Sequence, residues 1–248
     1  MADDTADAPL PRSIALAWGA VPPPQRGPKR EFSLEQVLDA AVALADADGI
    51  EAVTMPALAQ SLGLTAMSLY RYVVSKDTLL LLLQERGMGS PPPAIATAAT
   101  WRLGLDAYAE ASSAVYRRHA WMLDIAITGV ATTPNNLAWL EAGLTALAGT
   151  PLSRQERVAV VLQVSGHARF RALVERGYAV RADEEREPPA GVMLAEAQLL
   201  GRLVSTSQFP ELRATLDSGA LADDRFDSFD FGLARLLDGV EGYIDSLP

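Results

Sequence analysis

The spacing of apolar positions predicts helices along most of the chain. From residue 33 onward, apolar side chains recur at steps of three and four residues, which is the period of an amphipathic α-helix. The predicted helices cover residues 33–49, 54–63, 65–72, 75–86, 97–118, 121–127, 134–148, 153–181, 191–206 and 226–246. No segment alternates apolar and polar residues between turn signals, so no sheet is predicted. The pattern therefore predicts an all-α fold.

Start and stop signals delimit the first helices. Ser33 and Gln36 have the spacing of a capping box, and Gly49 supplies a left-handed stop. The second and third helices are short and are joined by Gly63 and Leu64. Short helices joined by a tight glycine turn are typical of a helix-turn-helix.

Prolines and glycines mark the boundaries between domains. Six of the 16 prolines lie in the first 28 residues: Pro9, Pro11, Pro22, Pro23, Pro24 and Pro28. Because neither a helix nor a central strand tolerates this density, residues 1–30 are predicted to be a flexible N-terminal arm. A second break, at residues 87–93, separates a helix-turn-helix domain (31–89) from a helical C-terminal domain (94–248). Residues 182–190 are predicted to be a polar connection.

Composition narrows the class of protein. With 49% hydrophobic and 21% charged residues, the chain has ample material for a packed core. The absence of cysteine excludes disulfides, thiolate nucleophiles and sulfur-ligated zinc, and two histidines leave little for metal chemistry. No metal site and no cofactor are expected.

Neither a membrane protein nor an enzyme is expected. No apolar run reaches the length of a membrane span, and the acidic N-terminus does not resemble a signal peptide, so we expect a soluble cytoplasmic protein. A nucleophile elbow, a phosphate loop and an HExxH motif are all missing from the sequence. Gly87 and Gly89 do not form a dinucleotide fingerprint, because Pro92 occupies the third position.

Charge is distributed unevenly. The net charge of -10 argues against a protein that coats nucleic acid by bulk electrostatics. Yet residues 52–76 contain no Asp or Glu while they retain Arg71 and Lys76. A surface that faces phosphates requires an absence of carboxylates, because a carboxylate would repel the duplex. The alternative is that a tight helix pair simply has little room for charges.

The acid-free segment contains side chains that suit DNA. Small residues and hydroxyls at the start of the third helix can approach base edges, and the cationic and tyrosine groups after them can bind phosphates. The predicted DNA contacts are Thr54, Thr65, Ala66, Met67, Ser68, Tyr70, Arg71, Tyr72 and Lys76. The two tyrosines could instead belong partly to the core.

The arm contains a second basic cluster. Arg26, Lys29 and Arg30 lie beside proline and glycine just before the first predicted helix. This composition suits an arm that lies in the minor groove, so Arg26 and Lys29 are predicted to add affinity for DNA. A solvated linker is the alternative.

Residues 54–80 resemble the DNA-binding domain of the tetracycline-repressor (TetR) family of bacterial transcriptional regulators. The resemblance rests on the ordered series of Thr54, Leu58-Ala59, Gly63, Leu69-Tyr70-Arg71 and Ser75-Lys76-Asp77. The chain departs from the usual pattern at Tyr72-Val73, where His-Phe is common, and at residues 66–68. The resemblance implies an all-helical cytoplasmic homodimer that binds a palindromic operator and is released when a small molecule enters its C-terminal domain.

The C-terminal half resembles the branch that includes the tetracycline repressors themselves. The similarity lies at Trp101 and in residues 118–121, 134–135 and 231–239, and it does not imply tetracycline as the ligand. In the last helix a seam recurs at steps of three and four residues: Phe229, Gly232, Leu236, Gly239 and Tyr243. The resemblance makes this seam, with the helix at 153–181, a dimer interface. An intramolecular seam is the alternative.

The effector site can be assigned only to a set of aromatic and polar residues that are expected to face the C-terminal interior. The set is Tyr108, Tyr116, Met122, Trp139, Gln163, His167, Phe170 and Arg171. Ordinary core or interface positions are the alternative for each of them. Two other functions also fit the pattern, namely a DNA-binding helical protein without an effector and a helical protein-interaction module.

Overall fold

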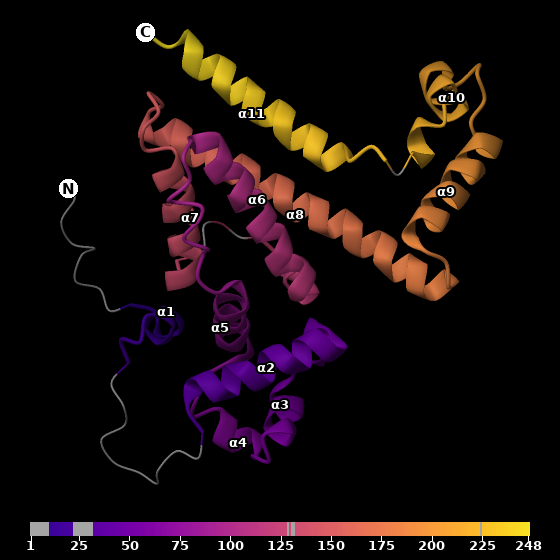
Figure 1. Ribbon diagram of the computed structural model, residues 1–248. Coiled ribbons are helices and arrows are strands. Elements are labelled where there is room, and N and C mark those ends of the chain that lie inside the picture. The colour runs from indigo at the N-terminus through magenta and orange to yellow at the C-terminus, as the bar shows by residue number, and fades with distance from the viewer. Residues whose placement is uncertain (1–9, 22–31, 128, 130–131, 224) are drawn as a thin grey trace. The chain divides into compact units, whose positions relative to one another are not determined.

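A computed structural model describes residues 10–21, 32–127, 129, 132–223 and 225–248. Within these ranges the regular elements are helices and none is a strand, which confirms the predicted all-α fold (Figure 1). None of the helices in the described ranges is long and apolar enough to cross a bilayer. The chain divides into two compact units, residues 1–162 and 163–248, and the boundary falls inside one long helix.

The described part of the first 89 residues consists of α-helices and a short 3-10 turn. They are α1 (Arg12–Ala17), α2 (Leu34–Asp48), η1 (Ile50–Ala52), α3 (Met55–Ser61), α4 (Ala66–Leu69) and α5 (Lys76–Met88). The predicted capping box begins α2, since Ser33 Oγ accepts from the Gln36 N–H at 3.1 Å and Gln36 Oε1 accepts from the Ser33 N–H at 2.8 Å. Local sequence thus determines where α2 starts.

The helix-turn-helix consists of α3, a glycine turn and α4. Gly63 adopts a φ of 68°, which an L side chain rarely takes, and the Leu64 N–H then donates to Ala59 O at 2.8 Å. Leu58 of α3 and Leu69 of α4 are completely buried. These two leucines belong to the apolar core of the domain that presents α4 at its surface.

The remainder of the first unit comprises α6 (Trp101–Arg118), the 3-10 segment η2 (Ala120–Asp124), α7 (Pro134–Ala146) and the beginning of α8 (Arg154–Glu185). Two glycines permit close helix contacts here. A Cβ on Gly143 of α7 would lie 2.8 Å from Val161 Cγ1, and one on Gly104 of α6 would lie 2.7 Å from Ala146 Cβ. The helices therefore approach more closely than a methyl group would permit.

The second unit contains the rest of α8 with α9 (Pro189–Leu203), α10 (Pro210–Asp217), η3 (Ala220–Ala222) and α11 (Ser228–Ser246). The elements α9, α10 and η3 pack against one another. The start of α11 is held to α8 by an ion-pair cluster, in which Arg171 donates to Asp227 at 3.0 Å and to Asp230 at 2.6 Å.

Several details differ from the sequence prediction. The helix predicted at 121–127 is the 3-10 segment η2, and the helix predicted at 97–118 begins at Trp101. The predicted arm contains the helix α1, whose residues contact α5. The third predicted helix ends at Leu69 rather than at residue 72, because the chain tightens into turns. The predicted connection at 182–190 is largely helical, since α8 continues to Glu185 and α9 begins at Pro189. The helix α10 was not predicted.

The close contact at Gly143 leads to a stability prediction. We expect Gly143→Ala to lower the free energy of unfolding by about 1–3 kcal/mol, because the new methyl group must displace Val161. The control is Gly177→Ala in α8, where a Cβ meets nothing within 4 Å and alanine favours the helix. Urea unfolding of both variants measures the difference. Equal stabilities would contradict the packing at Gly143.

Candidate nucleic-acid interface and regulatory residues

The surface around α4 exposes most of the side chains predicted to contact DNA. Met67 is 80% exposed and Tyr70 is 48% exposed, although both are large and largely apolar. Arg71 and Lys76 are exposed as well. Exposed apolar groups beside cations are suited to contact base edges and phosphates in one groove.

Hydroxyl groups on this surface also act as helix caps. Thr54 Oγ1 accepts from the Ala57 N–H at 3.2 Å, and Thr65 Oγ1 accepts from the Ser68 N–H at 3.1 Å. The Thr65 and Ser68 hydroxyls lie 3.0 Å apart, so one donates to the other. These bonds orient the hydroxyls at the starts of α3 and α4.

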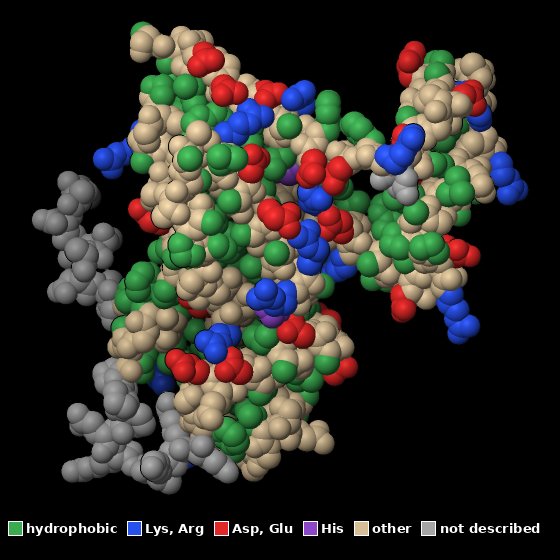
Figure 2. All heavy atoms as spheres, in the orientation of Figure 1, with side chains coloured by type: hydrophobic (Ala, Val, Ile, Leu, Met, Phe, Trp, Pro, Cys, Tyr) green, Lys and Arg blue, Asp and Glu red, His purple; other side chains and the backbone are tan. Residues whose placement is uncertain are grey.

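The acid-free segment forms one end of the first unit. On the face drawn in Figure 2, the described residues of α3 and α4 at the lower end of the molecule carry no red carboxylate, and red side chains begin at α2. The surface of α3 and α4 therefore lacks the carboxylates that would repel a duplex, although the whole chain is acidic.

Tyr72 is a correction to the predicted DNA contacts. Only 3% of this residue is exposed, and its hydroxyl accepts from the Phe32 N–H at 3.3 Å. The chain turns after Leu69, and this turn directs Tyr72 into the core together with Val73. Ala66 and Ser68 are half-buried. The predicted arm contacts Arg26 and Lys29 lie outside the described residues.

The junction between α5 and α7 was not anticipated as a site. The Asn135 N–H at the start of α7 donates to Glu85 Oε1 at 2.8 Å, and Asn135 Nδ2 donates to Glu85 O at 3.0 Å. The indole N–H of Trp139 donates to Gly89 O at 3.0 Å. No periodicity could indicate these pairs, because the partners are about fifty residues apart in sequence.

A second polar junction joins α2 to η2. Asp46 Oδ1 accepts from the Trp121 indole N–H at 2.7 Å and lies 2.8 Å from His119 Nδ1. The indole N–H of Trp18, which follows α1, donates to Thr132 O at 2.9 Å. Hydrogen bonds at separate points therefore connect the first 89 residues to the segment 119–139.

The first four predicted effector residues lie in the first unit. Tyr108, Met122 and Trp139 are buried, and Tyr116 is half-buried. The rings of Tyr108 and Trp139 form an edge-to-face pair with centroids 5.4 Å apart and an interplanar angle of 88°. Such a pair is a rigid aromatic wall.

The other four lie on the part of α8 that belongs to the second unit. His167 Nε2 lies 2.9 Å from Phe229 O, and Arg171 is engaged by Glu175, Asp227 and Asp230. Burial works against the charged form of Arg171, but hydrogen bonds to Glu175 and Asp230 raise its pKa above the ordinary value. These contacts favour a structural role for both side chains.

Gln163 and Phe170 are corrections, because both are exposed rather than interior. The buried stripe of α8 consists of Val161, Val164, Ala168 and Ala172. Gln163 and Phe170 each lie two positions beyond a member of that stripe, which places them on the opposite side of the helix.

The seam predicted in α11 has two kinds of neighbour. A Cβ on Gly232 would lie 3.1 Å from His167 Cε1, so this glycine accommodates α8 of the same chain, and the Phe229 ring contacts His167 as well. A Cβ on Gly239 would meet nothing within 4 Å, Tyr243 is 46% exposed, and Leu236 is half-buried. The far half of the seam therefore lies at or near the surface of the described chain.

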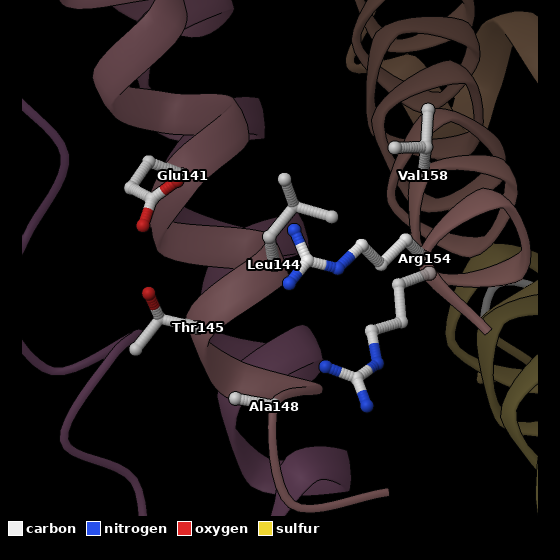
Figure 3. A pocket seen from close by; sticks show the side chains of 7 residues that line it. Glu141, Leu144, Thr145, Ala148, Arg154 and Val158 are labelled. Atoms are coloured by element: carbon white, nitrogen blue, oxygen red, sulfur yellow. The ribbon is translucent and has the colours of Figure 1, made fainter. Parts of the chain in front are cut away.

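A groove of about 290 Å³ lies between α7 and the start of α8. Figure 3 shows Glu141 and Thr145 on the α7 side and Arg154 and Val158 on the α8 side. The described residues that line this groove include none of the eight predicted effector residues. It is a surface feature distinct from the Tyr108–Trp139 pair.

Two family profiles match the chain. Residues 37–89 match the bacterial regulatory proteins of the tetR family, and residues 93–244 match the tetracyclin repressor-like C-terminal domain. The chain is 34% identical over 236 residues to the HTH-type transcriptional repressor DrrR1 of Streptomyces coeruleorubidus, covering 94% of this chain and 86% of that protein.

Solved structures share the fold. Apo ActR from Streptomyces coelicolor superposes with a TM-score of 0.69 at 21% identity, covering 88% of this chain and 99% of that chain. ActR in complex with actinorhodin gives a TM-score of 0.68 at 22% identity, covering 86% of this chain and 98% of that chain.

The geometry around α4 separates two roles that substitutions can test. We expect Arg71→Ala or Lys76→Ala to weaken binding to all duplexes and to lower the salt slope by about one for each, because each removes a predicted phosphate contact. Met67→Ala should instead change which sequence is preferred, because Met67 is 80% exposed on α4. Titrations at several salt concentrations measure the slopes. An altered base preference in Arg71→Ala with an unchanged salt slope would contradict these roles.

Proposed function

Because this chain belongs to the tetracycline-repressor (TetR) family of transcriptional regulators, we propose that it is a homodimeric repressor that a small molecule releases from a palindromic operator. The family consists of DNA-binding regulators, so the chain is not an enzyme. The observation that carries the proposal is the acid-free surface of α3 and α4 within a chain of net charge -10. A surface without carboxylates does not repel the phosphates of DNA.

The DNA-binding step uses two copies of α4. Thr65, Met67 and Ser68 face the base edges of a major groove, and Arg71 and Lys76 bind the flanking phosphates. A two-fold dimer presents α4 to two half-sites of opposite orientation, so the operator is a palindrome. The cytoplasm is where such a regulator meets its DNA.

The dimer forms through α8 and α11. These helices expose large apolar side chains, including Phe170 at 59%, Phe231 at 50% and Tyr243 at 46%. Exposed apolar patches of this kind mark interaction surfaces. Gly239 lets a partner helix approach α11 closely.

The effector is a small aromatic molecule that binds beside Tyr108, Met122 and Trp139. ActR is similar in fold and has been solved in complex with actinorhodin, which supports a ligand site in this chain. Buried aromatic walls with few polar groups suit such a ligand. Its entry shifts α5 and changes the separation of the two DNA-binding domains.

Selection from a pool of randomised duplexes tests the proposal. The purified chain is mixed with the pool, the bound fraction is sequenced, and the salt dependence of the enriched duplex is measured. Enrichment of a palindrome with a salt slope of several units is expected. The same duplex is then the probe in a screen for aromatic compounds that release the protein.

A matched duplex with one scrambled half-site is the control for the dimer. Loss of specific binding to that control, with retention of weak nonspecific binding, is expected of a two-fold complex. If no sequence is enriched, the chain does not act as a specific regulator, and the helical interaction module becomes the better description.

The basic arm gives a separate prediction. Replacing Arg26 and Lys29 together by glutamine should reduce affinity for the selected operator and lower the salt slope, because the arm then loses its contacts in the minor groove. Substitution is preferable to truncation, since α1 contacts α5 and Trp18 bonds to Thr132. An unchanged affinity and slope would show that the arm is a solvated linker.

A further inference from the structure

The facing ends of α5 and α7 cap each other. The side chain of Thr133, the N-cap of α7, makes no capping bond to its own helix. Glu85 of α5 instead accepts from the Asn135 N–H at 2.8 Å and so supplies the missing acceptor. The charge of Glu85 also lies at the positive end of the α7 dipole.

The end of α5 is satisfied in return by α7. Asn135 Nδ2 donates to Glu85 O at 3.0 Å, and the Trp139 indole N–H donates to Gly89 O at 3.0 Å. Gly89 is the C-cap of α5 and adopts a φ of 57°. Glu85 O also accepts from the Gly89 N–H at 3.4 Å, so the bonds from Asn135 and Trp139 add to the cap of α5 and hold its end against α7.

Trp139 belongs to this capping contact and also to the proposed effector wall. Its ring forms the edge-to-face pair with Tyr108, while its indole N–H binds the carbonyl of the α5 C-cap. Only 2% of the residue is exposed, and the ring cannot change its pairing with Tyr108 without moving its N–H. A displacement of the Trp139 ring therefore disturbs both contacts.

We propose that this reciprocal cap, formed by Glu85, Asn135, Trp139 and Gly89, is the latch through which an aromatic effector controls the DNA-binding domain. The proposal rests on the proposed function, because it names how that site is regulated. With the latch closed, α5 is held in the position that binds the operator. Rotation of the Trp139 ring by an aromatic ligand opens the latch and releases α5 from that position.

Two latch variants and a matched control test the proposal in the full-length chain. Trp139→Phe keeps a ring but removes the N–H that binds Gly89 O, and Asn135→Ala removes the side-chain bond to Glu85 O. The control, Trp121→Phe, removes an equivalent buried indole N–H, which binds Asp46 outside the latch. Thermal melts show whether each variant is folded, and Asn135→Ala decides the question if Trp139→Phe is not.

Two readouts are compared, and the probe is the operator selected from the randomised pool. The first is the operator dissociation constant, which we expect to rise about three- to tenfold in both latch variants and less than about twofold in the control. The second is the distance between spin labels on the two copies of Gln60→Cys in α3. The native chain has no cysteine, so the label is unique to that site. Latch variants should shift or broaden the distance distribution without any ligand.

Unchanged affinity and distances in the latch variants would overturn the proposal, as would an equal change in Trp121→Phe. Failure of the proposed function is a different result, because the wild-type chain would then select no operator. In that case the distance comparison between the latch variants and the control still decides whether the latch positions α5.

Discussion

Helix ends that meet inside a protein must find hydrogen-bond partners outside their own helix, and this constraint determines how α5 contacts α7. Each helix leaves N–H groups unpaired at its start and carbonyls unpaired at its end. At this junction, Glu85 accepts a hydrogen bond from the start of α7, while Asn135 and Trp139 donate hydrogen bonds to carbonyls at the end of α5. These bonds have strict geometry, so they allow fewer relative positions of the two helices than apolar packing alone would.

The acidic character of the chain becomes compatible with DNA binding through the placement of its carboxylates. Asp46 accepts from Trp121, Glu85 caps α7, and Asp39 pairs with Arg86 at 2.7 Å. In each case a carboxylate of the first 89 residues bonds to another helix or segment. These carboxylates therefore join α2 and α5 to each other and to neighbouring segments, while residues 52–76, which include α3 and α4, contain no Asp or Glu.

Features encoded within about four residues were predictable from the sequence, and features that depend on distant neighbours were not. The capping box of α2 and the Gly63 turn are local, and both were identified correctly. The burial of Tyr72 was missed, because it depends on where the chain turns after Leu69. The helix α1 was missed because the many prolines in the first 28 residues predicted a flexible arm. Six of these residues form a helix that contacts α5.

The same limit applies to the regulatory residues. A periodic seam shows which face of a helix is apolar, but it cannot show what covers that face, as Gly232 illustrates by accommodating His167 of the same chain. Trp139 was predicted correctly as a buried aromatic residue, yet its indole N–H has a partner fifty residues away. Because a tryptophan buries a large ring and must still satisfy one polar atom, it can join an apolar site to a backbone end. Trp139 therefore contacts both the Tyr108 ring and the carbonyl at the end of α5.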